Sequence, residues 1–159
     1  MHYIVGIADM KVTNEIDCTL ITYGLGSCIG MTVYDPLVKV GGLLHFMLPD
    51  SQIDIQKARL NPWMFADTAI PLFLRKVCQL GGEKRRLIIK VAGGSQILDS
   101  SGFFNIGKRN YLVLRKILWM HNLLVNGEDI GGEINRTLSL ELLTGKVFVK
   151  TPIDGVKEI

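Results

Sequence analysis

Residues 22–49, TYGLGSCIGMTVYDPLVKVGGLLHFMLP, indicate a β-hairpin preceded by a glycine-rich loop. Two apolar runs have the composition of strands: CIGMTVYD (28–35), which is rich in β-branched residues, and VGGLLHFML (40–48). Between them, Asp35-Pro36-Leu37-Val38 has the chemistry of a turn, because Pro sets φ at the second position and Asp is favoured at the first. We therefore expect two antiparallel strands that reverse at this turn.

The position of the turn determines which residues of the hairpin face each other. If the chain reverses between Pro36 and Leu37, opposed residues have numbers that sum to 73, which places Cys28 opposite His45. Opposed residues project to the same face with Cβ atoms roughly 4.5–5.5 Å apart, whereas a slip of one residue would put them on opposite faces. An even-membered turn thus predicts a thiol and an imidazole close enough to share a proton.

A paired cysteine and histidine can carry out nucleophilic catalysis, because the histidine accepts the thiol proton and the thiolate attacks. Gly24 and Gly26 allow a tight turn before the cysteine, and the N–H groups of Gly26 and Ser27 are candidates for holding an oxyanion. The alternative is structural. A lone cysteine in an apolar strand is usually a small buried hydrophobe, and the histidine opposite it would then be a core residue.

The strand before the loop adds a third candidate. Residues 18–23 alternate apolar and hydroxyl side chains, as a half-buried strand does, and they bring Thr22 to the loop. Its hydroxyl is a candidate for orienting His45, although a threonine in a strand is usually structural. Asp50 is a less favoured orienter, because an acidic residue after Pro49 is typical of a turn.

Composition limits the remaining choices. The 159 residues, of which 48% are hydrophobic, predict one domain over the whole chain, with about 152–159 as an exposed tail. Three irregularly spaced cysteines argue against a disulfide framework or zinc site and favour a reducing, cytoplasmic location. The net charge of +3 and short basic clusters without interleaved aromatic residues argue against nucleic-acid binding. We expect no targeting or membrane-spanning segment.

The rest of the chain predicts a mixed α/β fold with mainly antiparallel strands and flanking helices. Apolar residues at helical spacing indicate helices over about residues 62–80, with Asn61 as the cap and Pro71 inside, and over residues 108–121. The Gly93-Gly94-Ser95 segment follows a buried strand and predicts a tight exit that borders a substrate groove.

Six motifs then occur in the order seen in the CheD family of chemoreceptor glutamine deamidases, which the chain resembles from about Ile4 to Lys150. They are GLGSCIG, DPLVKVGGLLHFMLPDS, KVAGGSQI, NIGKRN, DIGG and LLTGKVFVK. The resemblance implies hydrolysis of glutamine side chains on methyl-accepting chemotaxis receptors to glutamate, without metal or cofactor. It places the family's catalytic residues at Cys28, His45 and Thr22, and it implies an α/β/β/α sandwich similar to the catalytic domain of cytotoxic necrotizing factor.

Two other functions remain open at this point. CheD-like proteins resemble one another in also binding a CheC-type phosphatase of the response regulator, so the chain could be a non-catalytic adaptor that stimulates such a phosphatase. A cysteine peptidase would use the same pair on the main chain and would need a groove for an extended backbone. The presence of Thr22, Cys28 and His45 together favours the deamidase, because an adaptor needs no nucleophile.

Overall fold

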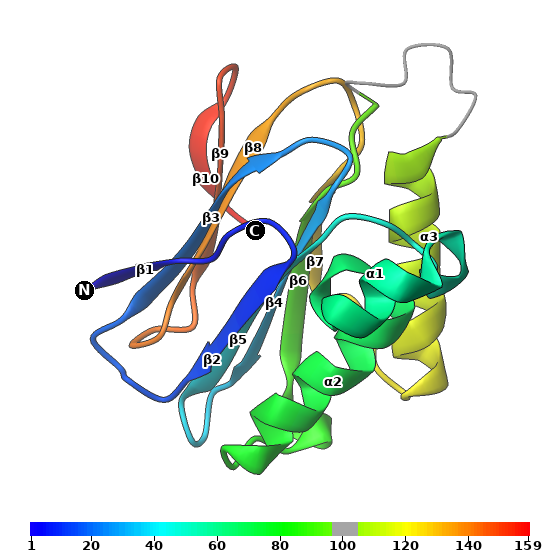
Figure 1. Cartoon of the computed structure of the whole chain (residues 1–159). Helices are drawn as coiled ribbons and strands as arrows, with labels where there is room; N and C mark the ends of the chain where they lie inside the picture. Colours follow the sequence, from blue (N-terminus) through cyan, green and yellow to red (C-terminus); the bar gives the residue numbers. More distant parts are fainter. Residues whose placement is uncertain (97–104) are drawn as a thin grey trace.

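The computed structural model describes residues 1–96 and 105–159, and these form two five-stranded sheets and a layer of helices (Figure 1). Sheet 1 consists, in spatial order, of β1 (His2–Ile4), β3 (Thr19–Leu25), β8 (Arg136–Glu141), β9 (Val147–Thr151) and β10 (Gly155–Glu158). Sheet 2 consists of β2 (Asp9–Thr13), β5 (Val40–Phe46), β4 (Ile29–Asp35), β6 (Ile88–Gly93) and β7 (Gly127–Ile130). Only the pairs β1–β3 and β6–β7 are parallel among these strands.

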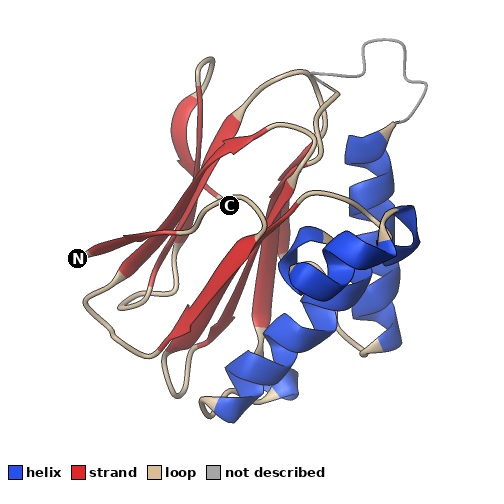
Figure 2. Ribbon diagram, in the orientation of Figure 1, coloured by secondary structure: helices blue, strands red, loops and turns tan. Residues whose placement is uncertain are grey.

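The helices lie together on the outer side of sheet 2 (Figure 2). They are α1 (Ile55–Leu60), α2 (Ala66–Gln79) and α3 (Ile106–Met120), with short 3-10 turns at Ser51–Ile53, Pro62–Met64 and Lys84–Arg86. Asn61 caps the turn at Pro62–Met64, where its side chain accepts a hydrogen bond from Trp63 N–H. The first predicted helix is thus divided at Phe65, whose backbone is extended, whereas α2 runs on through Pro71.

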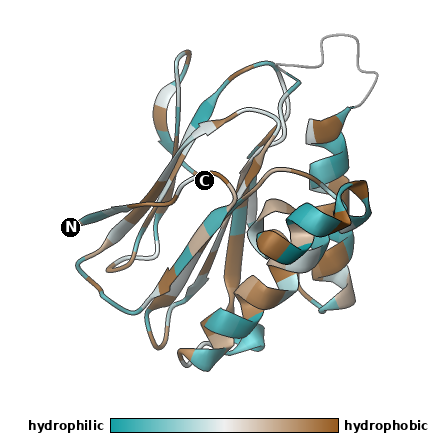
Figure 3. Ribbon diagram, in the orientation of Figure 1, coloured by the Kyte–Doolittle hydropathy of each residue, from teal (hydrophilic) through white to brown (hydrophobic). Residues whose placement is uncertain are grey.

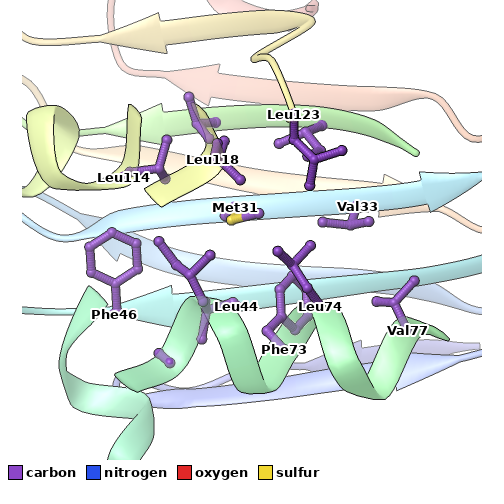
Figure 4. Packing of buried hydrophobic residues seen from close by; sticks show 14 of the residues in the cluster. Met31, Val33, Leu44, Phe46, Phe73, Leu74, Val77, Leu114, Leu118 and Leu123 are labelled. Atoms are coloured by element: carbon purple, nitrogen blue, oxygen red, sulfur yellow. The ribbon is translucent and has the colours of Figure 1, made fainter. Parts of the chain in front are cut away.

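Strands β4 and β5 separate two hydrophobic cores, because successive side chains point to opposite faces of a sheet. One set faces the helices and includes Met31, Leu44, Phe46 and, from α2, Phe73 (Figure 4). The other set lies between the sheets and includes Leu43. Burial on both faces explains why the hairpin sequence is almost continuously apolar, while hydrophobic and hydrophilic residues alternate along the helices (Figure 3).

The mixed, mainly antiparallel α/β class is confirmed, but the layers differ from those that the resemblance implied. Within the described residues, the outer face of sheet 1 carries no helix, so the order of layers is β/β/α (Figure 2). The residues of β8 give the physical reason. Leu138 and Leu140 are buried between the sheets, whereas Thr137 and Ser139 on the outer face are partly exposed and polar enough to meet water.

The predicted tail is a strand. Residues 155–158 form β10, which pairs antiparallel with β9 so that Val156 lies opposite Lys150. The side chains of β10 are exposed, because it is the edge strand of sheet 1. The sequence pattern did not indicate this strand because an edge strand with both faces in water has no apolar alternation.

Candidate active site

The hairpin register differs from the prediction by two residues. Ile29 lies opposite Phe46 and Asp35 opposite Val40, so opposed residue numbers sum to 75 rather than 73. The loop is longer than expected because Asp35 O accepts a hydrogen bond from Lys39 N–H at 2.9 Å and Lys39 adopts a left-handed φ of 54°. The predicted opposition of Cys28 and His45 is therefore wrong, and Gly30 lies opposite His45.

An error of two residues preserves the face on which a side chain lies. His45 is fully buried and follows the inter-sheet side of β5, as Leu43 does. Cys28 comes just before β4, is partly exposed, and packs against the inter-sheet core. Because Cys28 is two residues before Gly30, it lies diagonally across the strand pair from His45, a relation in which side chains can still meet.

Thr22 and His45 are in contact, as the sequence predicts. Thr22 Oγ1 lies 2.8 Å from His45 Nδ1 and 2.7 Å from the carbonyl oxygen of Val5. A carbonyl oxygen can only accept, so the single hydroxyl proton of Thr22 is donated to Val5 and Nδ1 of His45 must donate to the hydroxyl. This fixes the tautomer: the ring proton is on Nδ1 and Nε2 carries the lone pair.

The free nitrogen of His45 is the unusual feature of the site. Nε2 is buried and makes no hydrogen bond within the part of the chain that the structure describes. Buried polar atoms nearly always have a partner, and an exception calls for an explanation such as a catalytic role. A buried lone pair on the inter-sheet side against which Cys28 packs is what a general base for that thiol would need.

A bulge in β3 lies between Thr22 and the loop that contains Cys28. Thr22 pairs with Leu138, but the next pair joins Leu25 to Arg136, so β3 contains one extra residue there. Gly24 within this bulge has a φ of 67°, a conformation that glycine adopts without steric cost. The bulge bends the strand end and leads it into the loop that contains Cys28.

Burial determines the protonation states of the pair. Burial raises the pKa of the Cys28 thiol to about 11, an effect that its own backbone N–H partly offsets. Burial also lowers the pKa of His45 to about 4. Both shifts favour the neutral form. At neutral pH the two groups therefore rest uncharged, as a thiol and a neutral imidazole.

The predicted oxyanion donors need one correction. Gly26 N–H donates to Gly24 O at 3.0 Å, so it is already occupied. In contrast, no hydrogen bond to another residue is recorded for the N–H groups of Ser27 and Cys28 among the described residues. Ser27 therefore remains a candidate donor. Cys28 N–H is a second one, which sequence reasoning missed because the orientation of a peptide is not visible in a motif.

The segment Gly93-Gly94-Ser95 is buried and supports the loop from behind. Gly94 N–H donates to Cys28 O and Ser95 N–H to Gly26 O, both at 2.9 Å. A Cβ atom at Gly93 would collide with Cys28 O, which explains the need for glycine there. Gly94 also lines a cavity of about 330 Å³. A substrate-binding role for the three residues stays a prediction.

Beneath this segment lies a buried arginine that follows the DIGG motif in the sequence. Arg136 donates to Ser95 Oγ at 2.7 Å and to Gly131 O at 2.8 Å, and Ser95 Oγ donates to Ile134 O at 2.8 Å. These bonds hold the segment that carries Gly93 and Gly94 against the loop that contains Cys28. The physical signal in the sequence was weak, because one arginine in a strand pattern is usually exposed.

The other two cysteines lie away from this site, Cys18 buried in the inter-sheet core and Cys78 exposed on α2. In the described residues, no three His, Cys, Asp or Glu side chains are grouped so that they could hold a metal ion. No helix within residues 1–96 and 105–159 has the length and apolar character needed to cross a membrane.

Known proteins resemble this chain over nearly its whole length. The family described as CheD chemotactic sensory transduction matches residues 47–151. A Syntrophus aciditrophicus (strain SB) protein named probable chemoreceptor glutamine deamidase CheD 1 is 53% identical over 156 residues, which cover 98% of each chain. A Solibacter usitatus (strain Ellin6076) protein named probable chemoreceptor glutamine deamidase CheD is 50% identical over 147 residues, which cover 92% of this chain and 87% of the relative. The chain therefore belongs to the CheD family.

Proposed function

We propose that this protein deamidates selected glutamine side chains of methyl-accepting chemotaxis receptors to glutamate. One observation carries the proposal: Nε2 of His45 is buried without a partner among the described residues, with its tautomer fixed by Thr22, in the inter-sheet region against which Cys28 packs. The substrate comes from the relatives, which are named chemoreceptor glutamine deamidases.

The first half-reaction forms a thioester. Cys28 gives its thiol proton to His45 Nε2 as Sγ attacks the carboxamide carbon, which forms the S–C bond and leaves the negative charge on oxygen. The N–H groups of Ser27 and Cys28 hold that oxyanion. The imidazolium then gives the same proton to nitrogen as the C–N bond breaks, and ammonia leaves.

The second half-reaction restores the enzyme. Water gives a proton to His45 Nε2 while its oxygen attacks the thioester carbon. Collapse of the new oxyanion breaks the C–S bond, and the proton on His45 returns to sulfur. One water is consumed and one ammonia released per glutamine. Thr22 takes part only by keeping the Nδ1 proton of His45 in place.

We also propose a cytoplasmic location, because the three cysteines are free and a reducing compartment keeps them so. The adaptor for a CheC-type phosphatase is less well supported, since binding such a partner gives no reason to leave a histidine nitrogen buried and unpartnered. A peptidase would need a groove for an extended main chain beside Cys28.

The test is intact-mass analysis of a receptor cytoplasmic fragment incubated with the native protein, with Cys28→Ala and with Cys78→Ala. Each glutamine converted to glutamate adds ~1 Da, since an NH₂ group is replaced by OH in the acyl transfer. We expect the gain with the native protein and with the control Cys78→Ala, and a rate lower by about 10⁴-fold or more with Cys28→Ala. No gain from the native protein on several cognate receptors would overturn the proposal and favour the adaptor.

A further inference from the structure

A buried asparagine joins the two segments that carry the reacting groups. Asn110 is fully buried on α3, and its Nδ2 donates to Ser27 O and to Met47 O, each at 2.9 Å. Ser27 directly precedes the nucleophile, and Met47 lies two residues after His45. One carboxamide thus ties the Cys28 loop and the end of β5 to the same helix.

The orientation of this carboxamide is determined by its partners. Both partners are carbonyl oxygens, which only accept, so the NH₂ group must face them and both of its protons are used. Oδ1 is consequently left buried without a hydrogen bond to the described residues. An unpaired buried acceptor is costly, so an apolar residue would be the simpler choice if only packing mattered at this position.

The bond to Ser27 also determines where the next N–H group points. The peptide between Ser27 and Cys28 is trans, since the chain has no cis peptide bonds among its described residues. In a trans peptide the C=O and N–H groups point in opposite directions. Asn110 draws Ser27 O toward α3, so Cys28 N–H points away from α3, and the described residues provide no hydrogen-bond partner from another residue for it.

We propose that Asn110 is a positioning residue that fixes the Ser27–Cys28 peptide so that Cys28 N–H faces the oxyanion. The inference rests on the proposed deamidation. Asn110 then affects the stability of the transition state and not the location of the Cys28 thiol. The loop is held independently by the hydrogen bonds from Gly94 N–H to Cys28 O and from Ser95 N–H to Gly26 O.

The test compares Asn110→Leu and Asn110→Asp, which remove the donors at similar volume, with Leu114→Ala. Leu114 is buried one turn further along α3 in the helix-facing core, so its truncation weakens α3 packing without touching either carbonyl. Loss of one oxyanion donor lowers kcat by about 10²- to 10³-fold. We expect a fall of at least about 10²-fold for both Asn110 variants, with KM changed less than threefold, and a kcat within threefold of native for Leu114→Ala.

Alkylation of Cys28 by iodoacetamide separates positioning of the peptide from a general loss of structure. The alkylation reaction forms no oxyanion, so the rate of Cys28 alkylation in the Asn110 variants should stay within about threefold of native. The exposed Cys78 serves as the internal reference. If deamidation and alkylation fall together, Asn110 only holds the loop in place and the proposal is wrong. It is equally wrong if the Asn110 variants and Leu114→Ala have the same kcat.

A measurement on the native protein covers the case in which the Asn110 variants do not fold. The probe is a receptor peptide in which an aldehyde replaces the glutamine carboxamide. The Cys28 thiol adds to the aldehyde carbon, which forms an S–C bond, and the thiol proton passes through His45 to the aldehyde oxygen. We expect a downfield shift of the Cys28 amide proton on formation of this hemithioacetal, and no shift would overturn the inference. Because this readout needs no turnover, it decides about Cys28 N–H even if the native protein fails to deamidate receptors.

Discussion

The two ends of the β4–β5 hairpin both bury polar side chains, but only the turn end satisfies them. There, Asp35 is fully buried and accepts hydrogen bonds from the N–H groups of Leu37 and Glu83. Its Oδ2 also forms an ion pair with Nη2 of Arg86 at 2.9 Å. At the open end, His45 is equally buried, yet its Nε2 has no partner among the described residues. The difference separates a group whose bonds stabilise the fold from one whose lone pair is available to the proposed reaction.

The protonation behaviour of the two ends differs for the same reason. Burial alone would raise the pKa of Asp35, but the Arg86 bond and the backbone donors outweigh it and hold that pKa at about 2. The pKa of His45 responds to burial alone and falls to about 4. One end therefore keeps a charge in the interior, whereas the other keeps its base neutral.

The largest effect on the turn end should come from removing the partner of its buried charge. Arg86→Leu leaves Asp35 without its cation, and breaking a largely buried pair is strongly destabilising. We expect a melting temperature lower by roughly 5–10 °C in thermal unfolding, with deamidation at low temperature unchanged within about twofold.

The neighbouring Arg85 is the matched control, because it is 80% exposed and pairs with Glu83 on the surface. Arg85→Leu should shift the melting temperature by no more than about 2 °C. Equal shifts for the two arginine variants, or a loss of activity at low temperature in Arg86→Leu, would show that the two ends of the hairpin are not separate in function.

Burial of His45 at the open end should make the free energy of unfolding depend on pH. The unfolded chain binds a proton at His45 near pH 6.5, but the folded chain excludes it until about pH 4. Within this window the unfolded state holds more protons, so stability rises with pH by about 1.4 kcal/mol per unit, up to about 3 kcal/mol in total.

Urea unfolding of the native protein and His45→Gln at several pH values between 4 and 7 measures this contribution. The difference in unfolding free energy between the two proteins should grow as the pH rises through the window and level off above it. Parallel pH profiles would contradict a buried neutral histidine. Asp35 does not interfere, because its stabilising contribution is lost only as the pH falls below 3.8 toward about 2.

The smallest expected effect concerns the orientation of the base. Thr22→Val leaves the Nδ1 proton of His45 and the carbonyl of Val5 without their partner, a loss of about 1–3 kcal/mol. We expect kcat to fall by about 5- to 100-fold with little change in KM, whereas Thr22→Ser, which keeps the hydroxyl, stays within about threefold. Steady-state kinetics on the receptor fragment would tell the two variants apart, and equal kcat values would rule out orientation through the hydroxyl.

The hairpin illustrates how far the sequence could be interpreted. Its two strands and the Thr22–His45 contact followed from apolar runs, turn residues and family motifs, and the structure confirms them. The pairing register did not follow from the sequence, because a backbone hydrogen bond between Lys39 and Asp35 closes a longer loop, and composition does not specify that bond. The even parity of that loop nevertheless kept Cys28 and His45 on one side of the sheet.

By itself, the sequence determined the class of fold and the family, and it predicted the nucleophile and the base, since these depend on residue type, periodicity and motif order. The tertiary structure alone decided the pairing of Gly30 with His45, the occupied N–H of Gly26 and the bonds from Asn110 to Ser27 and Met47. These features depend on where peptide groups point and on contacts between residues far apart in the chain. Neither leaves a periodic signal in a linear sequence.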